Sequence, residues 1–281
     1  MLKSFWIQPE NNFILFVDIL GVKEHIKNGR TSVLTTILDT TVKEMKRVAK
    51  IMSLPDVGKD SVYFKMFSDN IIICSKSNWN YLLLVAAGLQ KHLATFGIFL
   101  RGSLCFGSIC AQPDFVLGEG LVRAYELESK CSVYPRIIVD TSFIEAMQEH
   151  ISATHADNHN KIFVSTKEKY FEVDKDEKIF IDYLNEARLA YNSENITMLN
   201  LMVEHQFRVK ANLLLHENKH RLTYNLETGE HIENIYKKFV WCRDYHNAFC
   251  QKHNQFLGLL IDEDIEKWRC EMIEQLHLIH K

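Results

Sequence analysis

Residues 64–76, FKMFSDNIIICSK, decide how the first half of this chain folds. Two apolar runs flank a break at residues 68–70, SDN, and Asp and Asn side chains favour turns because they hydrogen-bond the nearby backbone. The run after the break, III at residues 71–73, is β-branched and therefore favours a strand. The pattern predicts a hairpin over residues 61–76 with Asp69 in its turn. That carboxylate can serve the turn alone, or it can act with a second carboxylate elsewhere in the chain.

A second carboxylate lies near the end of the apolar run at residues 13–19, FILFVDI. A continuous, partly β-branched run predicts a strand buried on both faces. Asp18 is close to the end of this strand, and Gly21 permits a tight turn into residues 23–51, which have helical spacing. If the strand neighbours the hairpin, Asp18 and Asp69 meet at one edge, where two carboxylates can hold divalent cations for phosphate chemistry. Asp18 by itself can instead cap the following helix.

The rest of the chain completes an α+β pattern. Helical and strand-like segments alternate as a helix over 78–96, a strand over 98–109, a helix over 121–130, and a strand with a helix start over 135–144. This order predicts an antiparallel sheet covered by helices on one face. We expect residues 1–150 to form this core. Residues 151–281 are expected to add a strand pair around a solvated turn, DKDEK at 174–178, and a mainly helical extension packed on the core.

Composition narrows the functional classes. The 281 residues are 47% hydrophobic with a net charge of −3, so the chain can bury a large core and is not a general nucleic-acid binder, although a local basic pocket stays possible. The seven cysteines have no CxxC pair, which predicts free thiols in a reducing cytoplasm. The apolar stretches at 11–22 and 81–100 are interrupted by polar or charged residues, so we expect neither a signal peptide nor a membrane span.

Four motifs, in order, resemble those of the class III nucleotide cyclases. FVDILGVKEHI (16–26) is similar to the first-strand segment FxDIxGF, and KMFSDN (65–70) to the hairpin KxxGD. LRGSLCFGSI (100–109) resembles a strand that often reads RxGIxxG, and GEGLVRAYELE (118–128) a helix that often reads GxxVNxAARLE. The greatest similarity is to the bacterial pyrimidine cyclases of the Pycsar antiphage system. It rests on Gly118, Ala124, Tyr125, Leu127, Glu128, YPRI at 134–137, Trp241 and YHN at 245–247.

The resemblance implies a class III cyclase fold with a ferredoxin-type sheet, and an activity. That activity is a phosphorus–oxygen lyase reaction that converts a nucleoside triphosphate into the 3′,5′-cyclic monophosphate and pyrophosphate, with two divalent cations, Mg²⁺ or Mn²⁺. It further implies a homodimer with shared active sites, and a second messenger that activates a separate effector during phage infection. The implied metal ligands are Asp18, Asp69 and the Ile19 carbonyl. Backbone amides at Leu20, Gly21, Val22 and Lys23 are the implied phosphate-binding groups.

The base pocket implied by the resemblance includes Lys65, on the same strand face as Asp69, although Lys65 can also be a solvent-facing strand residue. Phe115 stands where purine cyclases usually have a polar residue, which favours a smaller pyrimidine base. A shift of one residue would put Asp114 there instead. A lysine can donate to a uracil carbonyl but faces a second donor at the cytosine amino group, so UTP is favoured and CTP is second.

Two further residues complete the expected base pocket, each with an alternative. Tyr125 is expected to stack on or hydrogen-bond the nucleoside, or else to be a core tyrosine of its helix. Arg101 is expected to contact the nucleotide, or else to organise the sheet.

The chain departs from the family at two positions, because Val122 and Glu126 replace a catalytic Asn and Arg. Arg123, Arg136 or Arg101 could stabilise the developing charge instead, since arginine matches phosphate geometry. The alternatives are therefore an adenylate or guanylate cyclase with an atypical pocket, and a degenerate cyclase-fold module that binds nucleotide or dimerises.

Overall fold

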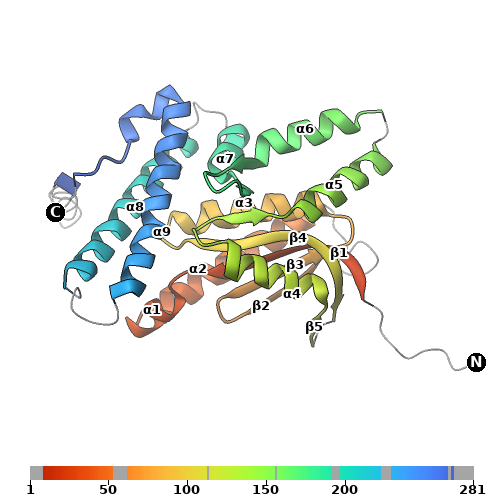
Figure 1. Ribbon diagram of the computed structural model, residues 1–281, viewed down its shortest axis with the longest axis horizontal. Helices are drawn as coiled ribbons and strands as arrows, with labels where there is room; N and C mark the ends of the chain where they lie inside the picture. The colour runs from red at the N-terminus through yellow and green to blue at the C-terminus, as the bar shows by residue number, and fades with distance from the viewer. Residues whose placement is uncertain are drawn as a thin grey trace, which may run out of the picture. The chain divides into compact units, whose positions relative to one another are not determined.

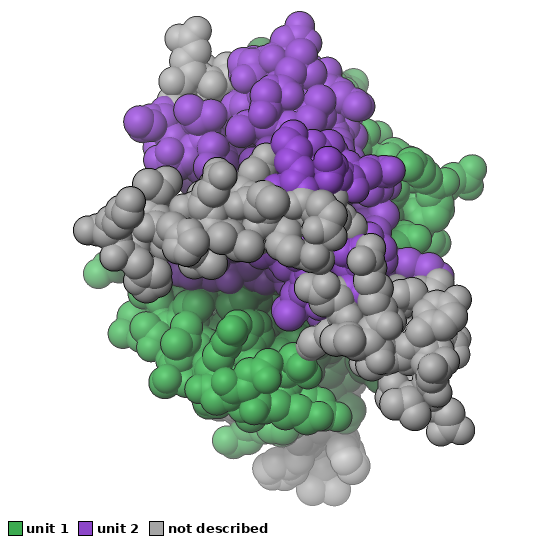
Figure 2. Space-filling model, turned by 90° about the vertical axis from the view of Figure 1, so that its left-hand side faces the viewer, with its two compact units in different colours: residues 1–93, 98–190 green, residues 94–97, 191–281 purple. Residues whose placement is uncertain are grey.

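The computed structural model describes residues 9–52, 62–112, 114–155, 157–191, 196–222, 229–264 and 267–268 (Figure 1). The chain divides into two compact units, which are coloured separately in Figure 2. Unit 1 comprises residues 1–93 and 98–190, and unit 2 comprises residues 94–97 and 191–281. Within the described ranges, no helix combines the length and apolar character that a membrane crossing needs.

An eight-stranded sheet forms the centre of unit 1. Its strands are β1 (Glu10–Ile19), β2 (Tyr63–Phe67), β3 (Asn70–Ser75), β4 (Leu100–Ala111), β5 (Val116–Leu117), β6 (Ile137–Val139), β7 (Phe171–Val173) and β8 (Ile179–Ile181). They follow the order β2-β3-β1-β4-β6-β8-β7, and β5 pairs with β4. The β4–β6 pair is parallel, whereas the sequence predicts an antiparallel sheet. The crossover from β4 to β6 runs through α4, which provides the long connection that parallel neighbours require.

Helices surround this sheet and confirm the predicted α+β class. They are α1 (Val22–Lys27), α2 (Thr31–Ile51), α3 (Trp79–Ala94), α4 (Glu119–Glu126), the π-helix η1 (Leu127–Cys131), α5 (Thr141–Thr154), α6 (His159–Tyr170) and α7 (Tyr183–Tyr191). The start of α5 is fixed by Asp140, whose carboxylate accepts a hydrogen bond from the Ser142 amide. The predicted hairpin, the strand over 13–19 and the helix over 78–96 are therefore present.

Both faces of the sheet are covered, so the expectation of helices on one face is wrong. On one face Ile14 and Phe16 pack in a cluster with Ala124 of α4. On the other face the Phe13 ring lies 5.2 Å from the Phe143 ring of α5. Figure 1 shows α4 and α5 on opposite sides of the strands. The cause is the apolar run of β1, which buries successive side chains on both faces, as its pattern predicts.

The strand pair expected in the extension belongs to the sheet of unit 1. Ile138 of β6 pairs with Phe180 of β8, which in turn pairs with β7. The compact units therefore divide near residue 190, whereas the sequence-based division lies at residue 150. A strand pair whose edge adds to an existing sheet buries more backbone hydrogen bonds than an isolated hairpin, which is marginal in water.

Unit 2 is mainly helical, as predicted for the extension. It contains α8 (Ile196–Leu222), α9 (Gly229–Lys252) and the 3₁₀ helix η2 (Asn254–Leu259). His205 of α8 and His246 of α9 are buried, and their Nδ1 atoms lie 3.0 Å apart. Asn247 holds residue Ile261 through two hydrogen bonds, from its amide nitrogen and to its amide oxygen. The YHN segment therefore ties the chain that follows α9 back onto that helix.

Candidate functional site

The strand ends that carry Asp18 and Asp69 are neighbours in the sheet, as predicted. Asp18 of β1 lies opposite Asn70 of β3 on one side and Arg101 of β4 on the other. The Ile19 amide donates a hydrogen bond to the Asp69 carbonyl, with 2.8 Å between N and O. The end of β1 and the hairpin turn are therefore joined at the residues expected to hold the metal.

The hairpin turn has a strained first residue. Phe67 and Asn70 are paired, so Ser68 and Asp69 form a two-residue loop. Ser68 has φ of 56°, in the left-handed region that favours glycine, which is the residue at this position in the cyclase motif KxxGD. Asn70 donates from its side-chain amide to Asp69 Oδ1 at 3.1 Å. The turn thus holds Asp69 at the edge of the sheet with its carboxylate beside an amide donor.

Asp18 is held by an arginine that contacts a second carboxylate. Arg101 Nε donates to Asp18 Oδ2 at 3.0 Å, and the same nitrogen lies 2.5 Å from Glu128 Oε1. The Glu128 side chain is 4% exposed and the Asp18 side chain 16%. Arg101 therefore organises the end of the sheet, which is one of its two predicted roles. Sequence reasoning assigned no role to Glu128, although it matches the last residue of the GxxVNxAARLE motif.

The donors at this edge fit a divalent cation completed by a substrate. Among the described residues, no three or more His, Cys, Asp or Glu side chains gather as a metal-binding group. Two carboxylates and a carbonyl are hard oxygen ligands, however, and Mg²⁺ is commonly bound by one or two carboxylates plus substrate phosphates. Asp18, Asp69 and Glu128 carry three negative charges against the single positive charge of Arg101. The local charge therefore favours a cation.

The turn after β1 has the backbone conformation expected of a phosphate-binding segment, but it is short. Gly21 has φ of 81°, and α1 contains six residues. The Leu20 amide is bonded to the Phe99 carbonyl at 3.0 Å, so Leu20 does not present its N–H to a phosphate. The amides of residues 21–23 open the first helical turn, where a helix has no acceptors of its own. The phosphate-binding prediction therefore narrows to Gly21, Val22 and Lys23.

The expected base-binding residues lie around the face of the sheet covered by α4. Lys65 and Phe16 both pair with Ile72, so their side chains share this face. Lys65 Nζ donates to the Asp114 carbonyl at 3.1 Å, which brings Lys65 beside the turn that carries Phe115. Lys65 itself is partly exposed.

The two aromatic candidates are at the surface. Phe115 is 47% exposed and Tyr125 is 56% exposed. The Tyr125 ring meets the Phe16 ring edge-on at 6.1 Å between centroids. Tyr125 is therefore not a core residue, although its ring contacts Phe16.

The two candidate catalytic arginines on or after α4 have carboxylate partners. Arg123 is half exposed and pairs with Asp140 at 2.6 Å, at the start of α5. Arg136 is fully buried and pairs with Asp174 and Asp176 in the turn between β7 and β8. Arg123 thus remains accessible at the surface, whereas Arg136 is enclosed in the protein.

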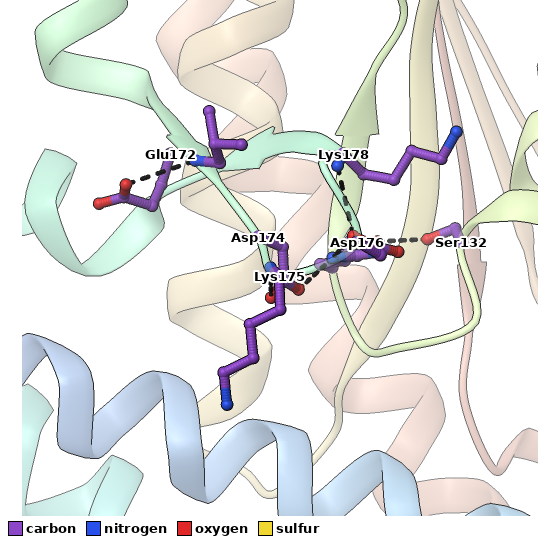
Figure 3. Close-up of polar contacts among 8 residues, drawn as sticks. Ser132, Glu172, Asp174, Lys175, Asp176 and Lys178 are labelled. Carbon is purple, nitrogen blue, oxygen red and sulfur yellow. Dashed lines mark hydrogen bonds and ion pairs between the residues drawn. The ribbon is translucent and has the colours of Figure 1, made fainter.

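Figure 3 shows the turn between β7 and β8, which carries Asp174 and Asp176, beside the segment that carries Ser132. Asp176 accepts from Lys178, and Ser132 Oγ donates to the Arg136 carbonyl at 2.7 Å. The prediction of a simply solvated DKDEK turn is therefore wrong, because two of its carboxylates neutralise a buried arginine. The same contacts make Arg136 a structural residue rather than a catalytic one.

The chain was compared with known families, curated proteins and solved structures. No family model and no curated protein matches the chain. The monomeric guanylyl cyclase domain of the RhoGC fusion protein from the aquatic fungus Blastocladiella emersonii aligns at 13% identity over 63% of this chain and 96% of that chain, with a TM-score of 0.41. A bacterial light-regulated adenylyl cyclase aligns at 13% identity over 51% of this chain and 47% of that chain, with a TM-score of 0.34. Both scores are low, so neither similarity favours one function over another.

Proposed function

We propose that this protein is a metal-dependent nucleotide cyclase that acts on a pyrimidine ribonucleoside triphosphate, with UTP favoured over CTP. The observation that carries the proposal is the junction of β1 with the β2–β3 turn, where Asp18 lies opposite Asn70 and the Ile19 amide is bonded to the Asp69 carbonyl. Four motifs that resemble those of the class III cyclases, in the same order, are the reason for proposing a cyclisation reaction. At the junction, the backbone joins the two strand ends that carry the residues matching the metal-ligand positions of those motifs.

In this proposal Asp18, Asp69 and the Ile19 carbonyl hold two divalent cations, Mg²⁺ or Mn²⁺. When bound, such cations make the ribose 3′-hydroxyl more acidic and neutralise the departing pyrophosphate. The chain itself orients the substrate. The amides of Gly21, Val22 and Lys23 receive phosphate oxygens, because the first turn of a helix leaves its N–H groups without partners.

Charge that develops on the phosphate needs a further cationic group, and Arg123 is the best candidate. Its side chain is half exposed, so it can reach a ligand or a second subunit. Arg136 is excluded from this role by its burial and its two carboxylate partners. Val122 and Glu126, which replace the catalytic Asn and Arg of the family, cannot donate the hydrogen bonds that a phosphate needs.

The preference for a pyrimidine rests on Phe115 and Lys65. Lys65 bonds to the Asp114 carbonyl, so the ammonium and the Phe115 ring are positioned by the same turn. Phe115 adds bulk and no hydrogen-bond partner for a purine amino group. Losing such a partner costs a ligand about 1–3 kcal/mol.

A homodimer is part of the proposal. Exposed apolar side chains lie on the β2–β3 turn, the β4–β5 hairpin and α4, and these are Phe67, Phe115, Leu117, Val122 and Tyr125. Large exposed apolar residues of this kind mark protein interfaces or ligand sites. We propose that a second copy covers them and completes the active site. The cyclic nucleotide would then act as a second messenger in antiphage defence and activate a separate effector.

An adenylate or guanylate cyclase is the second candidate. Asp114 lies next to Phe115 in the same turn, and an acidic side chain there can accept a hydrogen bond from a purine amino group. The two candidates therefore differ in the base that the pocket accepts.

The test is competition among equal concentrations of ATP, GTP, CTP and UTP with Mn²⁺, followed by identification of the cyclic products. We expect cyclic UMP to predominate. Asp18→Asn and Asp69→Asn should each abolish product, because each removes a charged ligand while keeping the side-chain size. Asp39→Asn is the matched control, since Asp39 is an exposed carboxylate of α2 that pairs with Lys43 one turn along the same helix. A mainly purine product would overturn the pyrimidine assignment, and no cyclic product from any triphosphate would overturn the activity.

A further inference from the structure

Glu128 is a buried carboxylate that the reaction described above does not use. It lies in η1, its side chain is 4% exposed, and its Oε1 atom is 2.5 Å from Arg101 Nε. The same nitrogen donates to Asp18 Oδ2 at 3.0 Å. The same guanidinium nitrogen therefore lies close to both the proposed metal ligand on β1 and a carboxylate from η1.

The local backbone explains how Glu128 reaches this place. After Glu126 the helix α4 widens into a π-helix, and the Ser132 amide bonds to the Leu127 carbonyl five residues earlier. Ser129 and Lys130 stay exposed, whereas Glu128 is turned inward. Isolated π-turns of this kind are rare and are frequent at functional sites. Here the π-turn has the specific effect of placing a negative charge against Arg101.

The arrangement sets up a competition for Asp18. A cation that binds Asp18 must share this carboxylate with the Arg101 guanidinium, because both are attracted to the same negative charge. Glu128 places a second negative charge beside Arg101, so Asp18 is not the sole carboxylate that balances the charge of the arginine in this cluster. It also keeps the arginine neutralised inside the protein when the Asp18 carboxylate turns to a metal.

We propose that Glu128 is a positioning residue for the divalent-cation site, which acts by holding Arg101 so that Asp18 can bind metal. This inference rests on the proposed function, since it takes Asp18 as a metal ligand. It goes further because it assigns a role to a residue that touches neither metal nor substrate. It also gives a reason for the π-turn.

The test measures Mn²⁺ binding itself, by electron paramagnetic resonance of free Mn²⁺ in titrations of the full-length protein without nucleotide. Glu128→Gln keeps the side-chain volume and removes the charge. Arg101 then pairs more strongly with Asp18 and competes with the metal for that carboxylate. We expect the dissociation constant for Mn²⁺ to rise about tenfold, which corresponds to the loss of one charge-assisted contact. Glu128→Asp keeps the charge and should bind Mn²⁺ better than Glu128→Gln. Glu145→Gln removes an exposed carboxylate from α5 and serves as the matched control.

A double-mutant cycle with Arg101→Gln shows whether Glu128 acts through the arginine. If it does, Glu128→Gln has no further effect on Mn²⁺ binding in the Arg101→Gln background, within about twofold. A tenfold loss in both backgrounds would mean that Glu128 acts on the metal directly, and would overturn the proposal. So would a Glu128→Asp variant that binds Mn²⁺ more weakly than Glu128→Gln, because side-chain volume and not charge would then matter.

Asp18→Asn separates this inference from the proposed function. If Asp18→Asn loses saturable Mn²⁺ binding and Glu128→Gln binds like the unmodified protein, the metal site stands and the role of Glu128 is overturned. If Asp18→Asn binds Mn²⁺ as the unmodified protein does, the metal site of the proposed function fails, and the role of Glu128 fails with it. Circular dichroism melts of each variant confirm that the folded protein is being titrated.

Discussion

At the residue scale, a fully buried arginine needs its charge balanced inside the protein. Arg136 is 0% exposed, and the balance comes from Asp174 and Asp176. Burial alone would raise the pKa of Asp176, but the hydrogen bond and the charge of Arg136 bring its pKa below the ordinary value. The two carboxylates differ in exposure, since the Asp174 side chain is 14% exposed and the Asp176 side chain 43%. The less exposed partner should therefore matter more.

We predict that Asp174→Asn lowers the free energy of unfolding by about 2 kcal/mol, because it removes a charge-assisted hydrogen bond to a buried guanidinium and leaves the more exposed Asp176 carboxylate to balance it. Asp176→Asn should have a smaller effect, since solvent screens its more exposed carboxylate. Urea denaturation at neutral pH measures both. Glu177→Gln is the control, because Glu177 is exposed in the same turn. Equal unfolding free energies for Asp174→Asn and Glu177→Gln would contradict the structural role given to the Arg136 cluster.

At the scale of elements, local patterns predicted most of unit 1. Three features of unit 1 are set by residues close together in the chain, so the sequence alone locates them. They are the β-branched run of β3, the turn residues at Asp69 and the apolar run of β1. The Ser68 turn is an example, because the two-residue loop forms although the favoured glycine is absent. The pairing of β8 with β6 was not predictable in this way. It depends on residues far apart in the chain and on which sheet edge remains available.

The same distinction applies to the candidate site. The positions of Asp18 and Asp69 at neighbouring strand ends could be predicted, since Asp18 lies near the end of an apolar strand pattern and Asp69 lies in a turn pattern. The partners of the arginines could not, because Arg101 meets Glu128 and Arg136 meets Asp174 across long stretches of sequence. A charged residue in a helix or turn is predicted to be solvent-exposed when the sequence does not identify its partner. Tertiary contacts of this kind therefore set the limit of the prediction.

In unit 2 a pair of histidines joins α8 to α9. His246 Nε2 lies 2.9 Å from the Leu259 carbonyl, which can only accept, so Nε2 carries the proton of the neutral ring. His246 Nδ1 is then the acceptor for His205 Nδ1–H at 3.0 Å. Burial lowers the pKa of His205 well below its ordinary value, and the neighbouring His246 lowers it further. Burial also lowers the pKa of His246, to about 4. Both rings are therefore neutral when folded.

We predict that unit 2 loses stability as the pH falls from 6.5 toward 4. An unfolded histidine takes up a proton near pH 6.5, whereas the folded pair resists it, so the unfolded state binds more protons in this range. Each such histidine lowers stability by about 1.4 kcal/mol per pH unit. Hydrogen exchange of α8 and α9 at pH 7 and pH 5 measures the change. His205→Asn should roughly halve the pH dependence, and His155→Asn, at an exposed position, should preserve it. A pH-independent protection of both helices in the unmodified protein would contradict the neutral pair.

At the scale of the whole molecule, the proposed active site draws on two groups of residues, the carboxylates at the strand ends and the exposed side chains of α4. Asp18 and Asp69 belong to the sheet edge, where the contacts of Arg101 and Asn70 hold them. Arg123 belongs to α4, where it is half exposed and pairs with Asp140. Apolar side chains such as Val122 and Tyr125 are exposed on the same helix. These positions suit a site in which α4 of one subunit faces the carboxylates of another.

This division predicts complementation between inactive subunits. Asp18→Ala damages the carboxylate half of a site and Arg123→Ala damages the α4 half, so a mixed dimer contains one intact site and one site with both lesions. Co-expression should restore cyclase activity to about a quarter of the unmodified level, since about half of randomly assorted dimers are mixed and each has one working site. Co-expression of Asp18→Ala with Asp69→Ala is the matched control, because both lesions fall on the carboxylate half and no intact site can form. Activity is measured with the triphosphate that gives the main product, after size-exclusion chromatography confirms the dimer. Absence of rescue in a confirmed mixed dimer would mean that each chain builds its site alone, and equal rescue in both mixtures would mean that Asp18 and Asp69 do not belong to the same half.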